Sequence, residues 1–382
     1  MAPWAAVTVK RIGLSDLSIP NFHPVVLAGG RGTRFWPLSR KRRAKQLLPL
    51  NSPKSMIQET VERLEPFASS QRIWIITNDD LRTPILQQLP GLVANQVLAE
   101  PVGRNTAPAI GLAAFMLERI DPKAVIGMFP SDHVILDESS FRASVQSAAA
   151  IAAAGANIVV MGIRPTRPET GYGYIESGAS SQRDALNVVR FTEKPGLDLA
   201  RKFVGAGNYF WNSGMFVWGA RTLADALREH LPNTAPILEQ IASSYGSANF
   251  EATLAALYPR CENISIDYAV LEPRSRKGEG KSGIFCLPAG FGWNDLGSWT
   301  ALFEHCKAKQ PMLDNAIPAE RQFVLDASGN FVHSNKFVAV VGVNNLVVVE
   351  TEDALLITTL ERAQDVGKVV AYLDGQNLTD LI

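Results

Sequence analysis

Three glycines and a run of cations near the N-terminus form the part of the sequence best suited to binding phosphate. Gly29, Gly30 and Gly32 follow an apolar segment, and glycines let backbone N–H groups converge on an anion without obstruction by a Cβ atom. Residues 31–45 contain seven cations and no acid, in a chain with 37 basic and 37 acidic residues. The positive field is therefore local, and a polyphosphate is the expected ligand.

The glycine spacing excludes two common phosphate motifs. No Gly-Lys-Ser/Thr follows, so the loop is not a Walker loop, and G-G-x-G without an immediate helix pattern is not the dinucleotide fingerprint. The alternative is a glycine turn beside a solvated basic face. The coincidence of glycines and charge at the end of a predicted strand favours the phosphate loop.

Charged side chains also follow two later apolar runs. Asp132 comes after Val125–Phe129, and the adjacent Glu193 and Lys194 come after Val188–Phe191. Glu193 could accept hydrogen bonds from sugar hydroxyls, while Lys194 could bind a sugar phosphate as a point charge. A turn aspartate and an exposed ion pair are the alternatives for these residues.

Two aromatic segments add candidates for sugar binding. Gly171, Tyr172 and Gly173 allow close backbone approach beside an aromatic ring, which suits packing on a sugar face. The segment 209–218 is too aromatic for a loop and too polar at its centre for core alone. Most of its aromatic side chains are expected to pack in the interior.

Short β-branched runs alternate with amphipathic stretches from Pro24 onward. This alternation predicts an α/β fold with a Rossmann-like, doubly wound, mostly parallel sheet, which binds ligands beyond the carboxyl ends of its strands. The expected strands are Val25–Ala28, Ile73–Thr77, Val93–Leu98, Val125–Phe129 and Ile158–Ile163.

Helix signals lie between these strands. Ser52 and Pro53 are the expected N-cap and first residue of a helix whose apolar face continues to Leu64. Thr106–Ile120, capped by its own first residue, and Ser139–Ala154 are the next two predicted helices.

The character of the chain changes near residue 310. Closely spaced strands are expected at Phe323–Leu325, Phe337–Val341 and Leu346–Glu350, separated by glycine and asparagine turn signals. The expected domains are therefore a body over 24–309 and a small β-rich C-terminal domain over 310–382. Residues 1–23 are expected to form a loosely held extension, because their apolar patch precedes their cations, the reverse of a signal peptide.

Composition limits the partners. The zero net charge gives no reason to expect nucleic acid or a membrane surface, and no apolar run is long enough to span a bilayer. Three cysteines without metal-ligand spacing fit a reducing compartment better than a disulfide framework. A cytoplasmic protein is expected.

The phosphate loop carries a family resemblance. The run Leu27–Arg34, with Pro37–Arg40 and Lys45-Gln46, resembles the signature of the nucleoside-diphospho-sugar pyrophosphorylases, and Ser-Asp-His at 131–133 resembles their GDP-mannose branch. The resemblance covers nearly the whole chain from Pro24 onward. It implies that the protein converts GTP and mannose 1-phosphate into GDP-mannose and pyrophosphate, with Mg²⁺ as cofactor. Ala44 departs from the proline common in the family, and a homodimer is left open.

The same resemblance assigns roles by position within a catalytic nucleotidylyltransferase domain. Arg34 and Lys45 would neutralise the phosphates, and Asp132, the third catalytic residue, would bind Mg²⁺ with Asp295, although Asp295 could instead order a turn. The expected nucleotide-binding residues are Leu27, Ala28, Gly29, Gly30, Gly32, Thr33, Glu100, Gly103, Arg104, Asn105 and Ser131. The expected sugar-phosphate-binding residues are Gly171, Tyr172, Gly173, Glu193, Lys194, Asn212 and Asp267.

Three alternatives remain beside this interpretation. The first is the same chemistry with another base or sugar, as in glucose-1-phosphate thymidylyl- or uridylyltransferases. The second is a non-catalytic regulatory homologue, which would be expected to have lost Arg34, Lys45 or the aspartates. Phosphomannose isomerase activity, the third, is not expected, because the C-terminal stretch is short and has no clustered His/Glu set.

Overall fold

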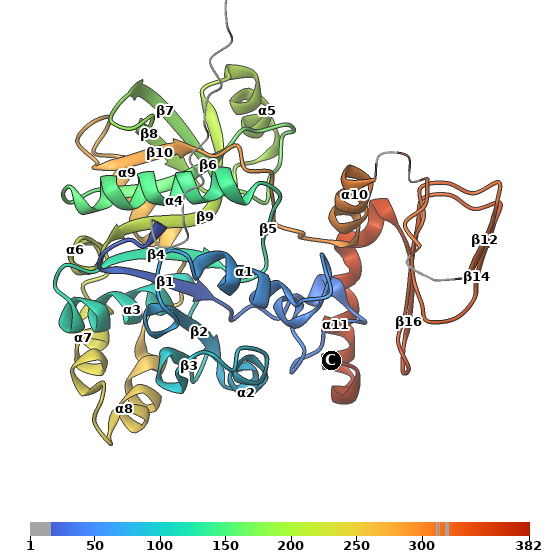
Figure 1. The fold of residues 1–382 in the computed structure, drawn as a ribbon, viewed down its shortest axis with the longest axis horizontal. Helices are drawn as coiled ribbons and strands as arrows, with labels where there is room; N and C mark the ends of the chain where they lie inside the picture. The colour runs from blue at the N-terminus through green and yellow to red at the C-terminus, as the bar shows by residue number, and fades with distance from the viewer. Residues whose placement is uncertain (1–16, 311, 313, 318–320) are drawn as a thin grey trace, which may run out of the picture.

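A nine-stranded sheet forms the centre of the protein. The computed structural model describes residues 17–310, 312, 314–317 and 321–382, and the strand order is β3-β2-β1-β4-β9-β6-β10-β8-β7 (Figure 1). The strands are β1 (Phe22–Leu27), β2 (Trp74–Asn78), β3 (Val97–Glu100), β4 (Val125–Pro130), β6 (Ile158–Ile163), β7 (Tyr174–Ser180), β8 (Leu186–Thr192), β9 (Tyr209–Gly219) and β10 (Ile284–Pro288).

The sheet has a parallel half and a mixed half. Strands β3, β2, β1 and β4 are parallel, so their carboxyl ends lie at one edge. Strand β9 runs antiparallel between β4 and β6, and β10 is parallel to β6. A short antiparallel pair, β5 (Val134–Ile135) with β11 (Trp293–Asn294), lies beside the main sheet. The expected parallel arrangement therefore describes the first half, which carries the glycine loop.

Helices cover both faces of the sheet, as the doubly wound prediction requires. Val25 of β1 packs into the core on one face and its neighbour Val26 into the core on the other, because successive strand residues point to opposite faces. One face is covered by α3 (Thr106–Ile120), α6 (Ala220–His230), α7 (Ala235–Ser244) and α8 (Phe250–Leu257). The other is covered by α1 (Met56–Leu64), α2 (Asp79–Gln88) and α4 (Glu138–Ala153). Two shorter helices are α5 (Leu197–Ala206) and α9 (Glu272–Ser275).

Two helix caps differ from the sequence predictions. Ser55, not Ser52, caps α1: its hydroxyl accepts from the N–H of Gln58, and the Gln58 side chain accepts from the N–H of Ser55. This reciprocal capping box satisfies two N–H groups at once, whereas the Ser52 hydroxyl only closes a turn. Asn105, not Thr106, caps α3.

Two strands also begin at residues other than the predicted ones. Strand β3 begins at Val97, because Ala94–Gln96 form a 3-10 turn and pairing with β2 extends instead to Glu100. Strand β1 begins at Phe22, which is fully buried, and the N–H of Ile19 donates to the Phe67 carbonyl 3.0 Å away. The chain is thus packed against the body before residue 24. The first sixteen residues of the expected extension lie outside the described residues.

The C-terminal segment is built from parallel coils. Strand β12 (Gln322–Leu325) pairs with β14 (Val338–Val341), and β13 (Phe331–His333) pairs with β15 (Leu346–Glu350), which also pairs with antiparallel β16 (Leu355–Thr359). Paired residues are sixteen apart in sequence, as in Gln322 with Val338, so each coil places its successor alongside it. The buried Asn330 links the coils, and its amide donates to the Val343 carbonyl 2.9 Å away.

Helices α10 (Trp299–Lys309) and α11 (Val366–Gly375) lie between the body and these coils (Figure 1). A separate apolar core joins Phe35 and Trp36 of the N-terminal half to Trp299, Phe331 and Val366. Among the described residues, no helix has the length and apolar character needed to cross a membrane.

Candidate active site

The glycine loop follows β1 with its carbonyl groups already bonded. Gln46 donates to the carbonyls of Ala28 and Gly30 at 2.8 and 3.1 Å, and Asn78 donates to the Gly29 carbonyl at 3.2 Å. Within the described chain, the N–H groups of residues 29–32 have no such partner in the protein. These N–H groups are therefore available to an anion at the strand end.

Gly32 brings the loop against Lys45. Its φ of 63° lies in the left-handed region, and an added Cβ would lie 2.3 Å from the Cβ of Lys45. Only glycine meets both demands. The hydroxyl of Ser39 fixes the turn by donating to the Gly32 carbonyl at 2.8 Å.

The Lys45 ammonium lies among three oxygen atoms at the centre of the site. It is 2.8 Å from the carboxylate of Asp132, 3.1 Å from the Asp132 carbonyl and 2.6 Å from the Asp295 carbonyl. Lys45 is buried, whereas the Asp132 side chain keeps 34% of its surface exposed. Burial opposes ionisation of Asp132, but attraction to Lys45 outweighs it and lowers the pKa of this carboxyl. Asp132 is therefore a partly exposed, charged carboxylate.

Asp295 reaches Lys45 through its backbone carbonyl, whereas its carboxylate accepts a hydrogen bond from the Gly297 N–H at 3.2 Å and so orders that turn. Burial, followed by the neighbouring Asp295 charge, raises the pKa of the Tyr172 hydroxyl. Next to Asp132, His133 Nδ1 accepts a hydrogen bond from the Trp293 indole at 3.1 Å. Burial lowers the pKa of His133, which therefore stays neutral near pH 7.

A second cluster lies on the later half of the sheet. Asn212 of β9 donates to the carboxylate of Asp267 at 2.9 Å, and the Lys194 ammonium lies 3.0 Å from the Glu193 carboxylate. Burial and then the negative charge of Glu193 raise the pKa of Asp267 to about 7. Asp267 begins a π-helical turn that ends at Leu271, a conformation frequent at functional sites.

One carboxylate oxygen of Glu193 lacks a partner. This Oε2 is buried and accepts no hydrogen bond within the described residues. An added Cβ on Gly173 would lie 2.5 Å from it, so the glycine leaves this oxygen room. A buried, unpaired carboxylate oxygen costs free energy unless a ligand hydroxyl pairs with it.

Glu100 ends β3 beside the glycine loop. Its carboxylate accepts a hydrogen bond from the Tyr258 hydroxyl at 2.5 Å, and its other oxygen would lie 3.4 Å from a Cβ on Gly29. Burial raises the pKa of Glu100 to about 7, although the hydrogen bond from Tyr258 opposes the rise. Half of this carboxyl group therefore faces the loop and half is held by Tyr258.

Arg34, predicted as catalytic, and the remaining predicted nucleotide-binding residues have different surroundings. The Arg34 side chain is exposed and donates to Gln364 of the C-terminal segment at 3.0 Å. The guanidinium of Arg104 donates to the Pro259 carbonyl, and Ser131 is buried. Gly103 is exposed in the turn before Asn105. Leu27 and Thr33 are half-buried at the two ends of the glycine loop.

Sequence reasoning missed four residues that donate hydrogen bonds to the glycine loop or to Glu100. It gave no role to Gln46, Thr77, Asn78 or Tyr258, although Thr77 also donates to the Ala28 carbonyl, at 3.0 Å. Gln46 could have been found, since it stands beside Lys45 in the motif. Tyr258 carried no signal, because it is 158 residues from Glu100.

Two family models match the chain. One, described as nucleotidyl transferase, matches residues 23–310. The other, described as a MannoseP isomerase/GMP-like beta-helix domain, matches residues 320–373. The first model includes every residue of the two clusters. Gln364, the partner of Arg34, lies beyond it, within the second model.

Two curated relatives are named mannose-1-phosphate guanylyltransferase. The relative from Salmonella muenchen is 39% identical over 363 residues, covering 93% of this chain and 74% of its own. The relative from Escherichia coli K12 is 37% identical over 373 residues, covering 94% of this chain and 75% of its own.

Two solved structures are also similar. A structure from Thermus thermophilus, described as mannose-1-phosphate geranyltransferase, has a TM-score of 0.81 and 32% identity and covers 93% of this chain and 99% of its own. A structure from Helicobacter pylori, described as mannose-6-phosphate isomerase, has a TM-score of 0.57 and 27% identity and covers 72% of this chain and 99% of its own.

Proposed function

The chain belongs to the nucleotidyl transferase family, and we infer from this membership that it is a mannose-1-phosphate guanylyltransferase. The observation that carries the inference is the set of N–H groups of residues 29–32 without a described partner, on a loop whose Gly32 packs against Lys45, the partner of Asp132. Together they offer a polyphosphate both hydrogen-bond donors and charge.

The reaction fits this arrangement without a covalent intermediate on the protein. A phosphate oxygen of mannose 1-phosphate forms a bond to the α-phosphorus of GTP, and the bond from that phosphorus to pyrophosphate breaks with its electron pair. Lys45 lies where it can balance negative charge on the transferring phosphate, and the loop N–H groups can hold the leaving pyrophosphate. The Arg34 side chain must break its hydrogen bond to Gln364 before it can neutralise charge on the phosphates.

We assign the sugar phosphate to the second cluster. The unpaired Glu193 oxygen suits a sugar hydroxyl, Asn212 and Asp267 offer further partners, and Lys194 suits the phosphate. Glu100, beside the loop, is assigned to the nucleotide. These roles are supported by the placement of the side chains on the two halves of one sheet edge.

Magnesium fits the oxygen atoms around Lys45. Asp132 supplies a carboxylate, which Mg²⁺ prefers, beside the Lys45 ammonium, and Asp295 adds its backbone carbonyl there. The Asp295 carboxylate accepts a hydrogen bond from the Gly297 N–H at 3.2 Å. When bound, the metal would neutralise charge on the transferring phosphate. We propose Asp132 and Asp295 as its protein ligands.

The metal proposal predicts a shifted requirement for Mg²⁺. In Asp132→Asn and Asp295→Asn variants, Mg²⁺ binding measured by calorimetry in the presence of GDP-mannose should weaken, and the melting temperature without ligand should change little. In a product-bound crystal structure, carboxylates more than about 6 Å from the ion would exclude direct ligation, since Mg–O distances are about 2.1 Å.

Pyrophosphate release tests the function. We expect release that requires both GTP and mannose 1-phosphate, with GDP-mannose as the second product. Fastest release with dTTP or UTP and glucose 1-phosphate would reassign the substrates. No release with any nucleotide would leave a regulatory homologue, and isomerisation of mannose 6-phosphate would favour the activity named for the Helicobacter relative.

The cell compartment and the assembly state belong to the same proposal. Cys261, Cys286 and Cys306 are free thiols, which suits the reducing cytoplasm. A homodimer is proposed because the C-terminal coils expose apolar side chains, among them Phe323 and Ile357. Sedimentation of the purified protein tests the dimer.

A further inference from the structure

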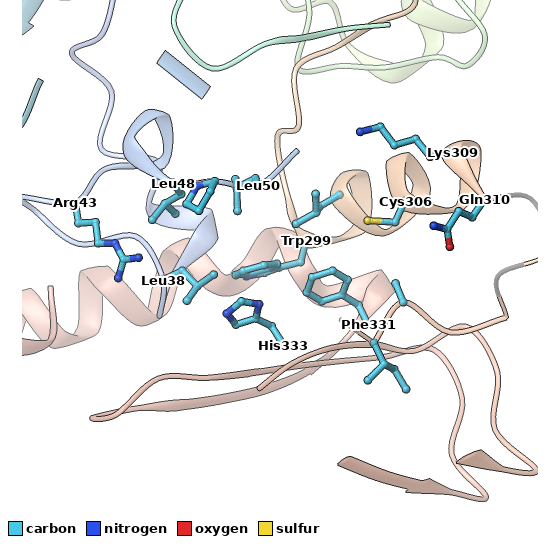
Figure 2. A pocket seen from close by; sticks show the side chains of 14 residues that line it. Leu38, Arg43, Leu48, Leu50, Trp299, Cys306, Lys309, Gln310, Phe331 and His333 are labelled. Carbon is cyan, nitrogen blue, oxygen red and sulfur yellow. The ribbon is translucent and has the colours of Figure 1, made fainter. Parts of the chain in front are cut away.

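A cavity of about 540 Å³ lies at the junction of the body, α10 and the C-terminal coils. Figure 2 shows Leu48 and Leu50 on one wall, Cys306 and Lys309 of α10 on another, and Phe331 with His333 on the third. None of the side chains assigned above to catalysis or substrate binding lines it. Its volume is that of a pocket for a small organic molecule.

The charged side chains around this cavity are all basic. Arg43 and Lys309 lie at its margin, and neither forms an ion pair with a described residue. The Lys309 ammonium is held only by neutral oxygens of Asn51, at 2.6 and 3.1 Å. No described lining residue is acidic. The cavity therefore attracts anions.

The remaining lining is apolar and partly aromatic. Trp299 lies near the centre, close to Leu38 and Phe331 (Figure 2). Leu302 and Ile317 also line the cavity. Burial, and then the charge of Arg43, lower the pKa of His333, which is therefore a neutral hydrogen-bonding group near pH 7. An apolar body with one charged group matches this lining better than inorganic phosphate does.

Two walls of the cavity continue into segments that hold the catalytic lysine. Leu48 and Pro49 follow the 3-10 turn Lys45–Leu47, and the Trp299 indole donates to the Trp36 carbonyl at 3.2 Å. A molecule that fills the cavity contacts both segments. Its binding free energy can therefore depend on how the loop is arranged.

We propose that this cavity is an effector site for a small amphipathic anion, with an aromatic or branched apolar body and one phosphate, sulfonate or carboxylate group. The claim that the anion binds here depends only on the cavity, whereas the claim that it changes enzyme activity rests on the proposed function. Binding and the effect on activity are therefore measured separately.

Cys306 gives a direct readout of occupancy. It lines the cavity and is partly exposed, whereas Cys261 and Cys286 are buried. N-ethylmaleimide should therefore alkylate Cys306 first in the folded protein. The probe is 8-anilinonaphthalene-1-sulfonate, an aryl sulfonate, and its uncharged analogue N-phenyl-1-naphthylamine is the control ligand.

We expect the sulfonate to protect Cys306 from alkylation at concentrations where the uncharged analogue does not. Lys309→Glu and Arg43→Glu should each weaken protection by about fivefold or more, the effect of about 1 kcal/mol for an exposed charge pair. Lys202→Glu, the same change at an exposed position on α5, should not. Equal protection by both ligands, or no protection in the wild-type protein, would overturn the site.

The effect on activity is tested by asking whether GTP changes the affinity of the cavity for the sulfonate. If the cavity and the nucleotide site are coupled, saturating GTP must change the affinity of the sulfonate for the cavity, by about fivefold for a typical coupling. Cys306→Trp, which fills the cavity, should abolish any effect of the sulfonate on pyrophosphate release. Unchanged affinity with GTP bound would remove the effector role, and a failure of the enzyme to turn over would not affect the binding result.

Discussion

Lys45 and Arg34 differ in their surroundings but serve the same phosphate in the proposed reaction. We expect Lys45→Ala and Arg34→Ala each to lower turnover by more than about a hundredfold, because removing a fixed charge or donor from a transition state costs about 3 kcal/mol. Steady-state pyrophosphate release measures the loss. Arg42→Ala is the matched control, since Arg42 is exposed in the same cationic run.

The melting temperature separates catalysis from folding in these variants. It should fall little in Arg34→Ala, because that side chain is exposed, and more in Lys45→Ala, because the buried Lys45 ammonium pairs with three oxygens. Near-normal kcat in the Lys45 variant would contradict its assigned role.

Lys194 and Asn212 belong to the cluster proposed to bind the sugar phosphate. Lys194→Ala and Asn212→Ala should raise KM for mannose 1-phosphate while changing KM for GTP little, since both residues lie on the later half of the sheet. Initial rates with each substrate varied in turn provide the test. An equal loss of affinity for GTP would mean that the two halves of the site are wrongly divided.

Glu100 makes stability depend on pH. Its pKa is raised to about 7, so between about pH 4.5 and 7 the folded protein binds more protons than the unfolded chain, and stability falls as pH rises. Above about pH 7 this contribution is lost. Glu100→Gln should therefore unfold at nearly the same temperature as the wild-type protein at low pH and at a higher temperature near pH 7.

The Tyr258 hydroxyl provides a second measurement on this carboxyl group. Its hydrogen bond opposes the rise of the Glu100 pKa, so Tyr258→Phe should move the pH-dependent step upward. A stability difference between Glu100→Gln and wild type that does not vary with pH would rule out the titration of Glu100 as the cause.

At the scale of elements, the glycine loop offers a matched pair of substitutions. Gly32→Ala places a Cβ 2.3 Å from Lys45 in a left-handed backbone conformation, whereas Gly30→Ala meets nothing within 4 Å. We expect Gly32→Ala to lower turnover by about a hundredfold through displacement of Lys45, and Gly30→Ala to have a far smaller effect. Similar losses in both variants would show that the close approach to Lys45 is not what matters.

Element boundaries show where local pattern is sufficient and where it fails. The apolar segment Thr106–Ile120 predicted α3 over the observed residues, because a segment of this length is long for a strand and ordinary for a buried helix. The caps at Ser55 and Asn105 were missed. Several polar residues compete near each helix start, and hydrogen-bond geometry decides between them.

At the scale of the whole molecule, a shared core joins the catalytic body to the C-terminal coils. Phe35 and Trp36 pack in one cluster with Phe331 and Val366, and the Trp36 indole donates to the Leu381 carbonyl at 2.8 Å. The Arg40 side chain also pairs with Asp353 at 2.9 Å. The two parts are therefore expected to unfold together.

Calorimetry tests this coupling. We expect one cooperative transition, and we expect Phe331→Ala to lower its midpoint because truncating a buried phenylalanine costs about 3 kcal/mol or more. Circular dichroism and residual activity should lose half their signal at the same temperature. Two separate transitions, with only one moved by Phe331→Ala, would contradict the shared core.

The sequence by itself determined the α/β class, the glycine-rich loop at the end of β1, and the change to short, closely spaced strands in the C-terminal segment. These features rest on short-range signals: strand and helix periodicity, glycines without a Cβ, and a cluster of cations in a neutral chain. Each signal lies within a short stretch of sequence, so it can be recognised without knowledge of the tertiary structure.

Only the tertiary structure decided which distant residues meet. It inserted β9 antiparallel into the sheet, placed Lys45 between Asp132 and the Asp295 carbonyl, and brought Tyr258 to Glu100. It also turned Arg34 toward Gln364 of the C-terminal segment. Contacts between residues 87 to 330 positions apart depend on how whole elements pack, and no local pattern in the chain encodes that packing.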